Sequence, residues 1–287
     1  MKIYLLPAPN RLQPGSQKFE YPSGNPDYGV EQDYLEYIVK SSLLTQSPDE
    51  ADWHYLPVFW TRWHLNHDYA KSGVDELQSE VSRVLIEPKK TFTICQYDDG
   101  PLINLGSAVV FLSSRKTSAG KDIPLLRNVL KLPFIKPRKR YLASFVGRLG
   151  TDPVRKEMAN ILSRNKDVFI EDGDKGQKFF VTRTLQSYTA LCPRGYGGSS
   201  FRFFEAMQLG VVPLLIGDID TRPFKKFIDW DEISLYVDNP DKLSSVLNRL
   251  NRKQLQTMGS KARAVYLEHL EYGKWPAYVI KELGLIK

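Results

Sequence analysis

A glycine-rich turn that leads directly into a short apolar helix has the residue types best suited to binding chemistry in this sequence. The turn is residues 194–198, RGYGG, and Ser199 and Ser200 follow it. A serine hydroxyl accepts a hydrogen bond from a free amide of a first helical turn. The free N–H groups and the dipole at such a helix start attract anions, above all phosphate. The pattern therefore predicts a phosphate site that includes Gly195 and Gly198.

The helix after this turn carries a polar stripe on an otherwise apolar surface. Arg202, Glu205 and Gln208 are spaced i, i+3 and i+6, which places them on one face. Gly210 ends the helix, because glycine readily adopts the left-handed cap conformation. Two interpretations are open: a solvated helix edge, or a ligand contact in which Arg202 meets phosphate and Glu205 accepts hydrogen bonds from ribose hydroxyls. The neighbouring phosphate turn favours the ligand contact.

The elements that position these residues alternate between strands and helices along the chain. Apolar runs predict strands over residues 2–6, 53–58, 91–95, 108–112, 140–146, 168–171, 188–192, 211–216 and 233–237. Helical spacing or capping signals predict helices over residues 31–44 and 74–86, after Asp152-Pro153, after Asn239-Pro240, and in the last segment. Such alternation is typical of α/β proteins with mostly parallel sheets.

Bulk composition fits a globular chain large enough for two domains. Its 287 residues are 42% hydrophobic and 25% charged, with a formal net charge of +7. That charge suits a diphosphate or an anionic glycan, although it is common on proteins with neither partner. The sequence contains no nucleic-acid recognition motif, so we expect no nucleic-acid partner. No apolar run approaches the ~20 residues of a membrane helix, so we expect no membrane span.

Two further features of the sequence have structural interpretations. Cys95 and Cys192 are too few for a disulfide framework and lack zinc-site spacing, so we expect both to be reduced core residues. The stretch KLPFIKPRKR, residues 131–140, is rich in proline and basic residues. It indicates a solvated interdomain linker rather than a nuclear-localisation patch.

A long segment beginning near the glycine-rich turn resembles the nucleotide-sugar-binding signature of exostosin-family glycosyltransferases. The likeness is carried by CPRG at 192–195, SSFRFFEAMQLGVVPLLIGD at 199–218, RPF at 222–224 and DW at 229–230. Weaker likeness extends upstream, to MKIYLLP at 1–7, EADWHYLPVFW at 50–60 and ASFVGR at 143–148. The resemblance covers most of the chain, and it is highly specific from about residue 188 to 230.

This resemblance implies the GT-B fold, with two Rossmann-like domains and a cleft between them. We expect an N-terminal acceptor domain at residues 1–136 and a nucleotide-sugar donor domain at 137–265. Closing helices at 266–287 are expected to pack back on the N-terminal domain, since their apolar residues exceed what a disordered tail carries. The implied activity is inverting, metal-independent transfer of xylose, galactose, arabinose or glucuronic acid from a UDP-sugar to a glycan hydroxyl.

The resemblance also sets expectations for partners and location. The partners are a UDP-sugar donor and a glycan acceptor on an oligosaccharide, polysaccharide or glycoprotein, and no further cofactor is expected. Animal and plant exostosin relatives are typically anchored in the Golgi membrane by an N-terminal helix. This chain begins directly with sequence that resembles the catalytic domain. We therefore expect a cytoplasmic enzyme of bacterial or large-virus type, or a trimmed Golgi-type catalytic domain.

Within such a fold, several residues are candidates for the transfer chemistry. Arg148 and Arg194 come at strand ends, where they neutralise the diphosphate as it leaves; the alternative is that both are surface arginines. Arg155 is a weaker candidate, because it lies inside a helix expected to be amphipathic. Nucleotide-sugar binding is thus assigned to Arg148, Arg194, Gly195, Gly198, Ser199, Ser200, Arg202 and Glu205.

An inverting transfer also needs a group that takes the proton of the acceptor hydroxyl. Asp98 and Asp99 follow the strand at 91–95 and are the first candidates, and His64 is the second. The alternatives are that the two aspartates form an ordinary polar turn before Gly100 and that the histidine is a packed, hydrogen-bonded residue.

Two rival functions remain open. Residues 172–174 and 218–220 are both Asp-x-Asp triplets, and in the other main glycosyltransferase fold such a triplet holds a divalent metal against the diphosphate. Activity in excess chelator separates that enzyme from the metal-independent one. The second rival is a non-catalytic protein on the same fold that binds carbohydrate or nucleotide-sugar, since a fold alone does not determine function. Turnover of a UDP-sugar to UDP separates the two.

Overall fold

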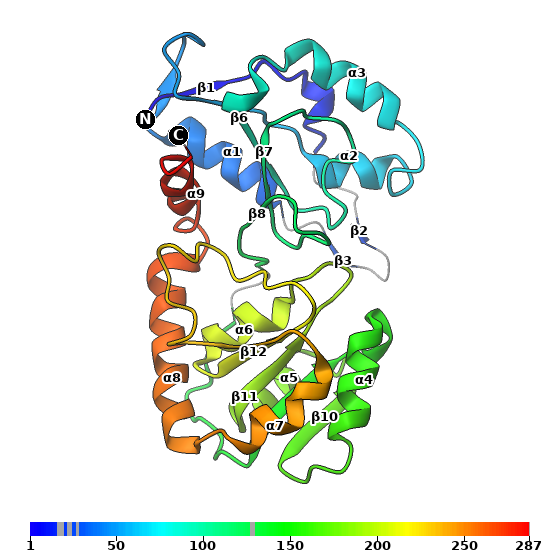
Figure 1. Cartoon of the computed structure of the whole chain (residues 1–287), viewed down its shortest axis with the longest axis vertical. Coiled ribbons are helices and arrows are strands. Elements are labelled where there is room, and N and C mark those ends of the chain that lie inside the picture. Colours follow the sequence, from blue (N-terminus) through cyan, green and yellow to red (C-terminus); the bar gives the residue numbers. More distant parts are fainter. Residues whose placement is uncertain (16–19, 22–24, 27–28, 127–129, 287) are drawn as a thin grey trace. The chain divides into compact units, whose positions relative to one another are not determined.

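The computed structural model describes residues 1–15, 20–21, 25–26, 29–126 and 130–286 (Figure 1). The chain divides into two units. The first comprises Met1–Arg115, Ala119–Ile123 and Pro276–Lys287, and the second comprises Lys116–Ser118 and Pro124–Trp275. The second unit thus begins before residue 137, and the closing segment divides at residues 275 and 276.

The first unit contains a six-stranded parallel sheet with the order β4-β1-β5-β6-β7-β8. Its strands are β1 (Ile3–Leu5), β4 (Leu44–Thr45), β5 (Trp53–Tyr55), β6 (Thr91–Cys95), β7 (Val109–Leu112) and β8 (Lys121–Asp122). Its α-helices are α1 (Val30–Lys40), α2 (Trp60–Asn66), α3 (Val74–Val84) and α9 (Pro276–Leu283), and 3-10 turns cover Asn10–Leu12 and Pro88–Lys90. A separate antiparallel pair joins β2 (Glu20–Tyr21) to β3 (Asn25–Pro26).

The second unit is built on a five-stranded parallel sheet with the order β10-β9-β11-β12-β13. Its strands are β9 (Tyr141–Gly147), β10 (Val168–Asp172), β11 (Ser187–Pro193), β12 (Val212–Ile216) and β13 (Leu235–Val237). Its α-helices are α4 (Pro153–Leu162), α5 (Gln177–Leu185), α6 (Phe201–Leu209), α7 (Leu243–Asn248) and α8 (Arg252–Val265). Leu149–Thr151 and Pro240–Lys242 are 3-10 turns, and a π-helical turn, Tyr266–Leu270, continues α8.

Strand order in the second unit defines where a ligand site belongs. The first strand, β9, has the second strand, β10, on one side and the third, β11, on the other. The winding direction therefore reverses between β9 and β11. In open α/β sheets, ligands bind outside the carboxyl ends of the strands at such a switch point.

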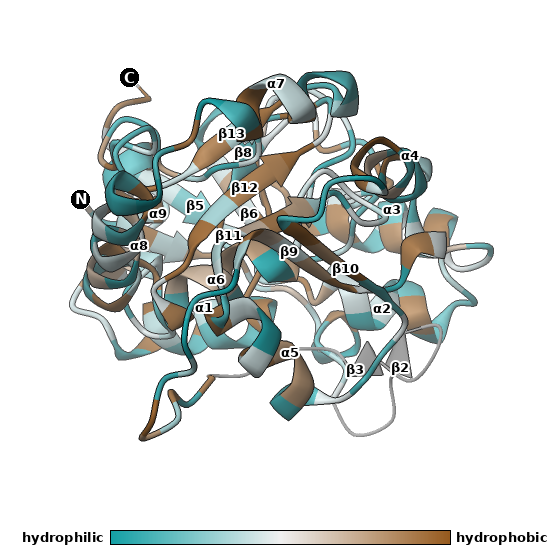
Figure 2. Cartoon of the chain, turned by 90° about the horizontal axis from the view of Figure 1, so that it is seen from below, coloured by the Kyte–Doolittle hydropathy of each residue, from teal (hydrophilic) through white to brown (hydrophobic). Residues whose placement is uncertain are grey.

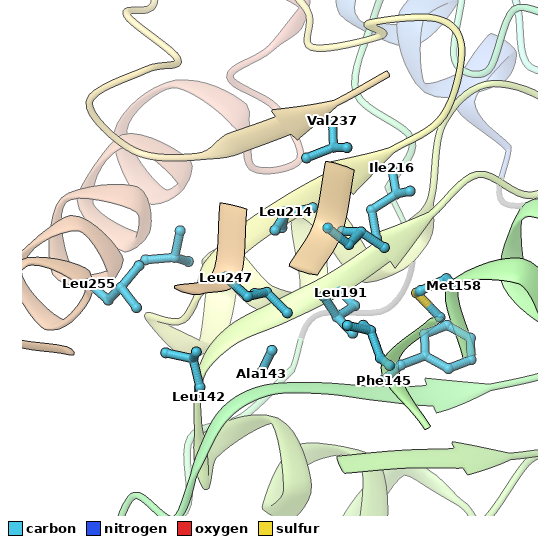
Figure 3. Close-up of a cluster of buried hydrophobic side chains, with 13 residues drawn as sticks. Leu142, Ala143, Phe145, Met158, Leu191, Leu214, Ile216, Val237, Leu247 and Leu255 are labelled. Carbon is cyan, nitrogen blue, oxygen red and sulfur yellow. The ribbon is translucent and has the colours of Figure 1, made fainter. Parts of the chain in front are cut away.

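The core of the second unit fixes this sheet rigidly. Figure 3 shows side chains from β9, β11 and β12 packed together with those from α4 and α7. Leu214 and Ile216 of β12 are fully buried, as expected for a parallel strand covered on both faces. The α/β class and the parallel sheets, one in each unit, are confirmed.

The ends of α4, α6 and β11 match the sequence signals only in part. Asp152 caps α4, because its carboxylate accepts a hydrogen bond of 3.0 Å from the Val154 N–H. Gly210 ends α6 with a φ of 71°, as predicted. The predicted hydroxyl cap is wrong for Ser200, which is the N-cap residue of α6 but makes no side-chain capping bond. Strand β11 is one residue longer at each end than the predicted range 188–192, and its last residue, Pro193, pairs with Ile216.

The basic stretch at residues 131–140 lies within the second unit, so the interdomain-linker interpretation is wrong. Both cysteines are reduced and buried, as predicted: Cys95 ends β6 and Cys192 lies in β11. None of the helices in the described ranges has the length and apolar character needed to cross a bilayer.

Candidate active site

Arg155 holds together the carboxyl ends of β9 and β11. Its Nε donates to the Arg194 carbonyl oxygen at 2.8 Å, and its Nη1 donates to the Arg148 carbonyl oxygen at 3.0 Å. Its Nη2 lies 3.5 Å from the Pro193 carbonyl oxygen. Burial, with the nearby Arg202 charge, lowers the pKa of Arg155 to about 10, so the guanidinium stays charged at neutral pH. The sequence indicated Arg155 only as a weaker candidate for the diphosphate site, yet its hydrogen bonds join the two strand ends at the switch point.

Arg202 and Glu205 form a charged pair on α6. The Arg202 Nη1 lies 2.5 Å from the Glu205 Oε2, and the Arg202 Nε donates to the Val146 carbonyl oxygen of β9 at 2.9 Å. The guanidinium carbon lies 4.3 Å from the centroid of the Phe180 ring, within cation–π range. The pair is therefore anchored to the sheet and to α5.

Two residues of the polar stripe of α6 are buried and Arg202 is half-buried, so the solvated-edge interpretation is wrong. Glu205 is 4% exposed and Gln208 is 2% exposed. The Gln208 Oε1 accepts a hydrogen bond of 2.7 Å from the Leu130 N–H. A buried carboxylate is costly unless it is paired and hydrogen-bonded. Arg202 supplies that pairing for Glu205.

A pocket of about 150 Å³ opens beside this pair. It is lined by residues from the β10–α5 loop, from β9, α5 and α6, and from the segment before β9: Gly173, Asp174, Lys175, Gly176, Gln177, Val146, Phe180, Arg202, Glu205 and Leu130. Gly173 and Gly176 have φ values of 89° and 79°, a region that glycine enters at no steric cost. The loop thereby curves around a site that combines apolar side chains, Leu130, Val146 and Phe180, with charged ones that include Arg202 and Glu205.

Arg194 lies between two carboxylates at the end of β11. Its Nη1 forms an ion pair with Asp218, and its Nε lies 3.6 Å from the Asp152 carboxylate. The side chain of Arg148, by contrast, is exposed. The structure therefore brings both predicted arginines to the switch point, Arg194 with acidic partners and Arg148 facing solvent.

The two Asp-x-Asp triplets make contacts with the protein itself. The Asp172 carboxylate accepts a bond of 2.8 Å from the Leu149 N–H, and Asp174 accepts one of 2.8 Å from the Gly176 N–H. Asp220 forms two bonds of 2.9 Å with the Arg222 guanidinium. Across residues 1–15, 29–126 and 130–286, no three His, Cys, Asp or Glu side chains are grouped to hold a metal ion.

The proposed proton acceptors lie in the first unit. Asp98 and Asp99 occupy a turn after β6 that is closed by a 2.9 Å bond from the Gly100 N–H to the Tyr97 carbonyl oxygen. His64 of α2 is 0% exposed, and its Nε2 lies 3.0 Å from the Pro101 carbonyl oxygen. The structure thus leaves Asp99 exposed and Asp98 half-buried, and it buries His64.

The burial of His64 predicts a pH-dependent stability. Burial lowers the pKa of His64 from 6.5 to about 4. A histidine with a lowered pKa in the folded state binds more protons after unfolding, so the stability present above pH 6.5 is lost as the pH falls toward 4. The free energy of unfolding of the first unit should fall by ~2 kcal/mol between pH 7 and pH 5. Urea denaturation at both pH values measures this fall.

The matched variant is His64→Gln, because a glutamine amide can still donate to the Pro101 carbonyl oxygen but does not titrate. This variant should lose most of the pH dependence between pH 7 and pH 5. An equal fall in the variant and the native chain would show that other groups cause it.

The part of the chain that holds the pocket is similar to a known protein family. The model of the Exostosin GT47 domain matches residues 113–252, which include β9–β13 and the whole pocket region. The Exostosin-1 homolog of Caenorhabditis elegans is 23% identical over 94% of this chain and 81% of its own length. Residues 113–252 are thus an exostosin GT47 domain.

The chain is also similar to other known proteins. A probable glucuronosyltransferase of Oryza sativa subsp. japonica is 22% identical over 87% of this chain and 71% of its own length. A solved sucrose-phosphate synthase from Thermosynechococcus elongatus aligns with 88% of this chain and 70% of its own, at 13% identity and a TM-score of 0.40. The family match at residues 113–252 bears out the enzyme class as well, so this protein is a glycosyltransferase.

Proposed function

We propose that this exostosin-family enzyme moves a sugar from a UDP-sugar to a glycan hydroxyl, with inversion at the anomeric carbon and without an essential metal. The observation that carries the proposal is the buried Arg202–Glu205 pair, which lines a pocket next to the start of α6. A carboxylate beside a phosphate-binding helix start is the arrangement that a nucleoside diphosphate needs.

The uridine half of the donor fits the pocket of the second unit. Because Arg202 bonds to the Oε2 of Glu205, we assign the Oε1 to the ribose hydroxyls. Phe180 and Leu130 supply apolar surface for the base. In this pose Arg202 positions Glu205 through its bond to the Val146 carbonyl, rather than meeting phosphate as its main contact.

The diphosphate is assigned to the glycine-rich turn and the arginines of the switch point. The turn is held by a 3.1 Å bond from the Gly195 N–H to the Ser199 carbonyl oxygen, and Gly198 accepts a bond of 3.3 Å from the Thr221 hydroxyl. Ser200 then begins α6, whose dipole favours negative charge. Arg148 and Arg155 add full positive charge beside the leaving group.

Transfer itself forms a bond between the acceptor oxygen and the anomeric carbon and breaks the bond from that carbon to the diphosphate. The acceptor proton needs a base, and we assign it to Asp98 or Asp99 rather than to the buried His64. Of the four donor sugars that the family likeness implies, glucuronic acid is favoured by the names of the rice relatives. UDP-glucuronic acid is therefore the first donor to test.

Binding of UDP without metal tests the donor site. Excess UDP should raise the melting temperature of the purified protein equally with and without EDTA, since a ligand at 100 times its Kd stabilises the native state by ~2.7 kcal/mol. Differential scanning fluorimetry measures the shift. A shift that requires manganese or magnesium and disappears with EDTA would favour the Asp-x-Asp mechanism.

Turnover tests the reaction separately from binding. Release of UDP from a panel of UDP-sugars, with and without glycan acceptors, should identify one donor that is consumed, and NMR of the product should show inverted anomeric configuration. Tight UDP binding with no turnover on any donor would support the non-catalytic alternative.

A further inference from the structure

The segment at residues 131–140, KLPFIKPRKR, carries an exposed apolar tip between basic residues, and we call it the basic loop. Phe134 is 104% exposed and Ile135 is 80% exposed, the two highest values among the large hydrophobic residues of the described chain. Single exposed apolar residues are ordinary on protein surfaces, but an adjacent, fully exposed pair at a loop tip indicates an interaction site.

The charge around this tip is entirely positive. The basic loop contains five Lys or Arg residues, namely Lys131, Lys136, Arg138, Lys139 and Arg140, and no acidic residue. Figure 2 shows the loop projecting beside α5, with a brown apolar tip and a teal limb that leads into β9. Apolar and basic groups are therefore presented together at one projection of the second unit.

Both ends of the basic loop are fastened to the second unit. The Leu130 N–H, just before the loop, donates to Gln208 on α6. At the other end, the Arg140 N–H donates to the Gln186 carbonyl oxygen at 2.7 Å. The Lys139 Nζ donates to the Ser187 carbonyl oxygen, and it lies 5.5 Å from the centroid of the Tyr188 ring.

Two prolines further limit how the fastened loop can fold. Pro133 and Pro137 fix φ on each side of the apolar tip. The loop therefore holds its apolar tip in solvent instead of collapsing it onto the protein.

We propose that the basic loop is a peripheral membrane-binding element that inserts Phe134 and Ile135 into the interface of an anionic lipid bilayer. Its exposed basic residues, Lys131, Lys136, Arg138 and Arg140, bind the lipid headgroups. Stable interfacial binding generally needs two signals, and an apolar insertion plus a polybasic patch is one such pair. This role is separate from the proposed UDP-sugar transfer, because no basic-loop residue is assigned to the pocket.

An anionic bilayer accounts for the exposed apolar tip of the basic loop better than a soluble polyanion does. An anionic glycan or an RNA backbone would satisfy the lysines and arginines, but a hydrated polymer offers no apolar phase to receive an isoleucine. A bilayer interface receives both side chains and places the flanking charges at headgroup level. The apolar pair therefore distinguishes the lipid partner from the polyanions.

Sedimentation of the full chain with vesicles tests the proposal. Binding to phosphatidylcholine vesicles that contain 30% phosphatidylserine should exceed binding to pure phosphatidylcholine by at least tenfold, and it should fall at high salt. Lys136→Glu with Arg138→Glu should weaken binding roughly 25-fold or more, at about fivefold per charge. Phe134→Ser with Ile135→Ser should weaken it roughly tenfold or more.

Matched substitutions on the first unit control for general surface effects. Val39 is an exposed apolar residue and Lys89 an exposed basic one. Val39→Ser with Lys89→Glu should leave vesicle binding unchanged. All variants should retain the native melting temperature and UDP-induced stabilisation, which separates failure of this proposal from failure of the donor site.

A fluorescent reporter shows whether the tip inserts. The native Cys95 and Cys192 are buried, so Phe134→Cys provides an exposed thiol for an environment-sensitive dye. A blue shift with anionic vesicles is expected. The proposal is overturned if the dye does not shift. It is also overturned if binding survives the double serine substitution, or if heparin or single-stranded RNA binds the chain and the vesicles do not.

Discussion

Replacing Glu205 by glutamine is expected to weaken UDP binding by about five- to 150-fold, equivalent to ~1–3 kcal/mol, the range for a lost charge-assisted hydrogen bond. Glutamine preserves the side-chain volume and offers an oxygen to Arg202, so the packing of α6 should survive. What it removes is the negative charge that lines the pocket. Isothermal titration calorimetry with UDP measures the loss.

A matched control separates the loss of this carboxylate from a general change in charge. Glu157 is exposed on α4, and Glu157→Gln should leave UDP affinity unchanged. Glu205→Ala should lose at least as much affinity as Glu205→Gln, with near-native circular dichroism. Unchanged UDP affinity in Glu205→Gln would show that the ribose lies elsewhere.

The sequence predicts the regular elements of the fold well where their burial is strong. Strand β6 is buried along its whole length, and its predicted bounds, residues 91–95, are those observed. Helices α2 and α5 were not predicted from the sequence. Helix α2 has seven residues and follows an apolar strand, so its pattern merges with the run before it. Helix α5 contains β-branched residues that lower helix propensity.

For Ser200 and Arg155, the local sequence pattern did not determine which contacts the side chain makes in the folded protein. Ser200 has the extended backbone of an N-cap residue, but its hydroxyl does not cap, because hydroxyl orientation depends on tertiary neighbours. Arg155 was discounted as part of an amphipathic helix. It lies in the first turn of α4, directly after the β9–α4 connection, and therefore at the carboxyl edge of the sheet. First-turn arginines after strands are a signal that sequence analysis can use.

The sequence predicted the site residues on α6, but it did not predict the pocket residues that other helices, strands and loops contribute. Glu205 stood out because a single acidic residue in an apolar helix needs a partner. The β10–α5 loop and Phe180 complete the pocket only because β10 lies beside β9. Strand order is a tertiary property, so the sequence presented residues 172–174 as an Asp-x-Asp triplet of the metal-binding type and gave no sign that residues 173–177 form a pocket wall.

Removal of residues 276–287 is expected to unfold the first unit, although this segment lies at the far end of the sequence from the rest of that unit. Helix α9 buries Tyr278, Val279 and Leu283, and Glu282 forms an ion pair of 3.4 Å with Lys121 of β8. Each large apolar side chain contributes ~1.5–3 kcal/mol when buried. Their combined loss approaches the whole stability of an ordinary domain, ~5–15 kcal/mol.

The truncated chain also tests whether the donor site belongs to the second unit alone. A chain ending at Trp275 should lose the unfolding transition of the first unit and all sugar transfer, yet bind UDP with near-native affinity, because every pocket residue lies within Pro124–Trp275. Leu283→Ala should lower the stability of the first unit by ~2–5 kcal/mol, whereas Lys281→Ala, at an exposed position of α9, should not. Calorimetric unfolding and UDP titration measure the effects of the truncation and of the two substitutions.

Two outcomes would contradict these expectations. A truncated chain that melts like the full chain would show that α9 is dispensable. A truncated chain that folds but no longer binds UDP would show that part of the donor site lies outside the second unit.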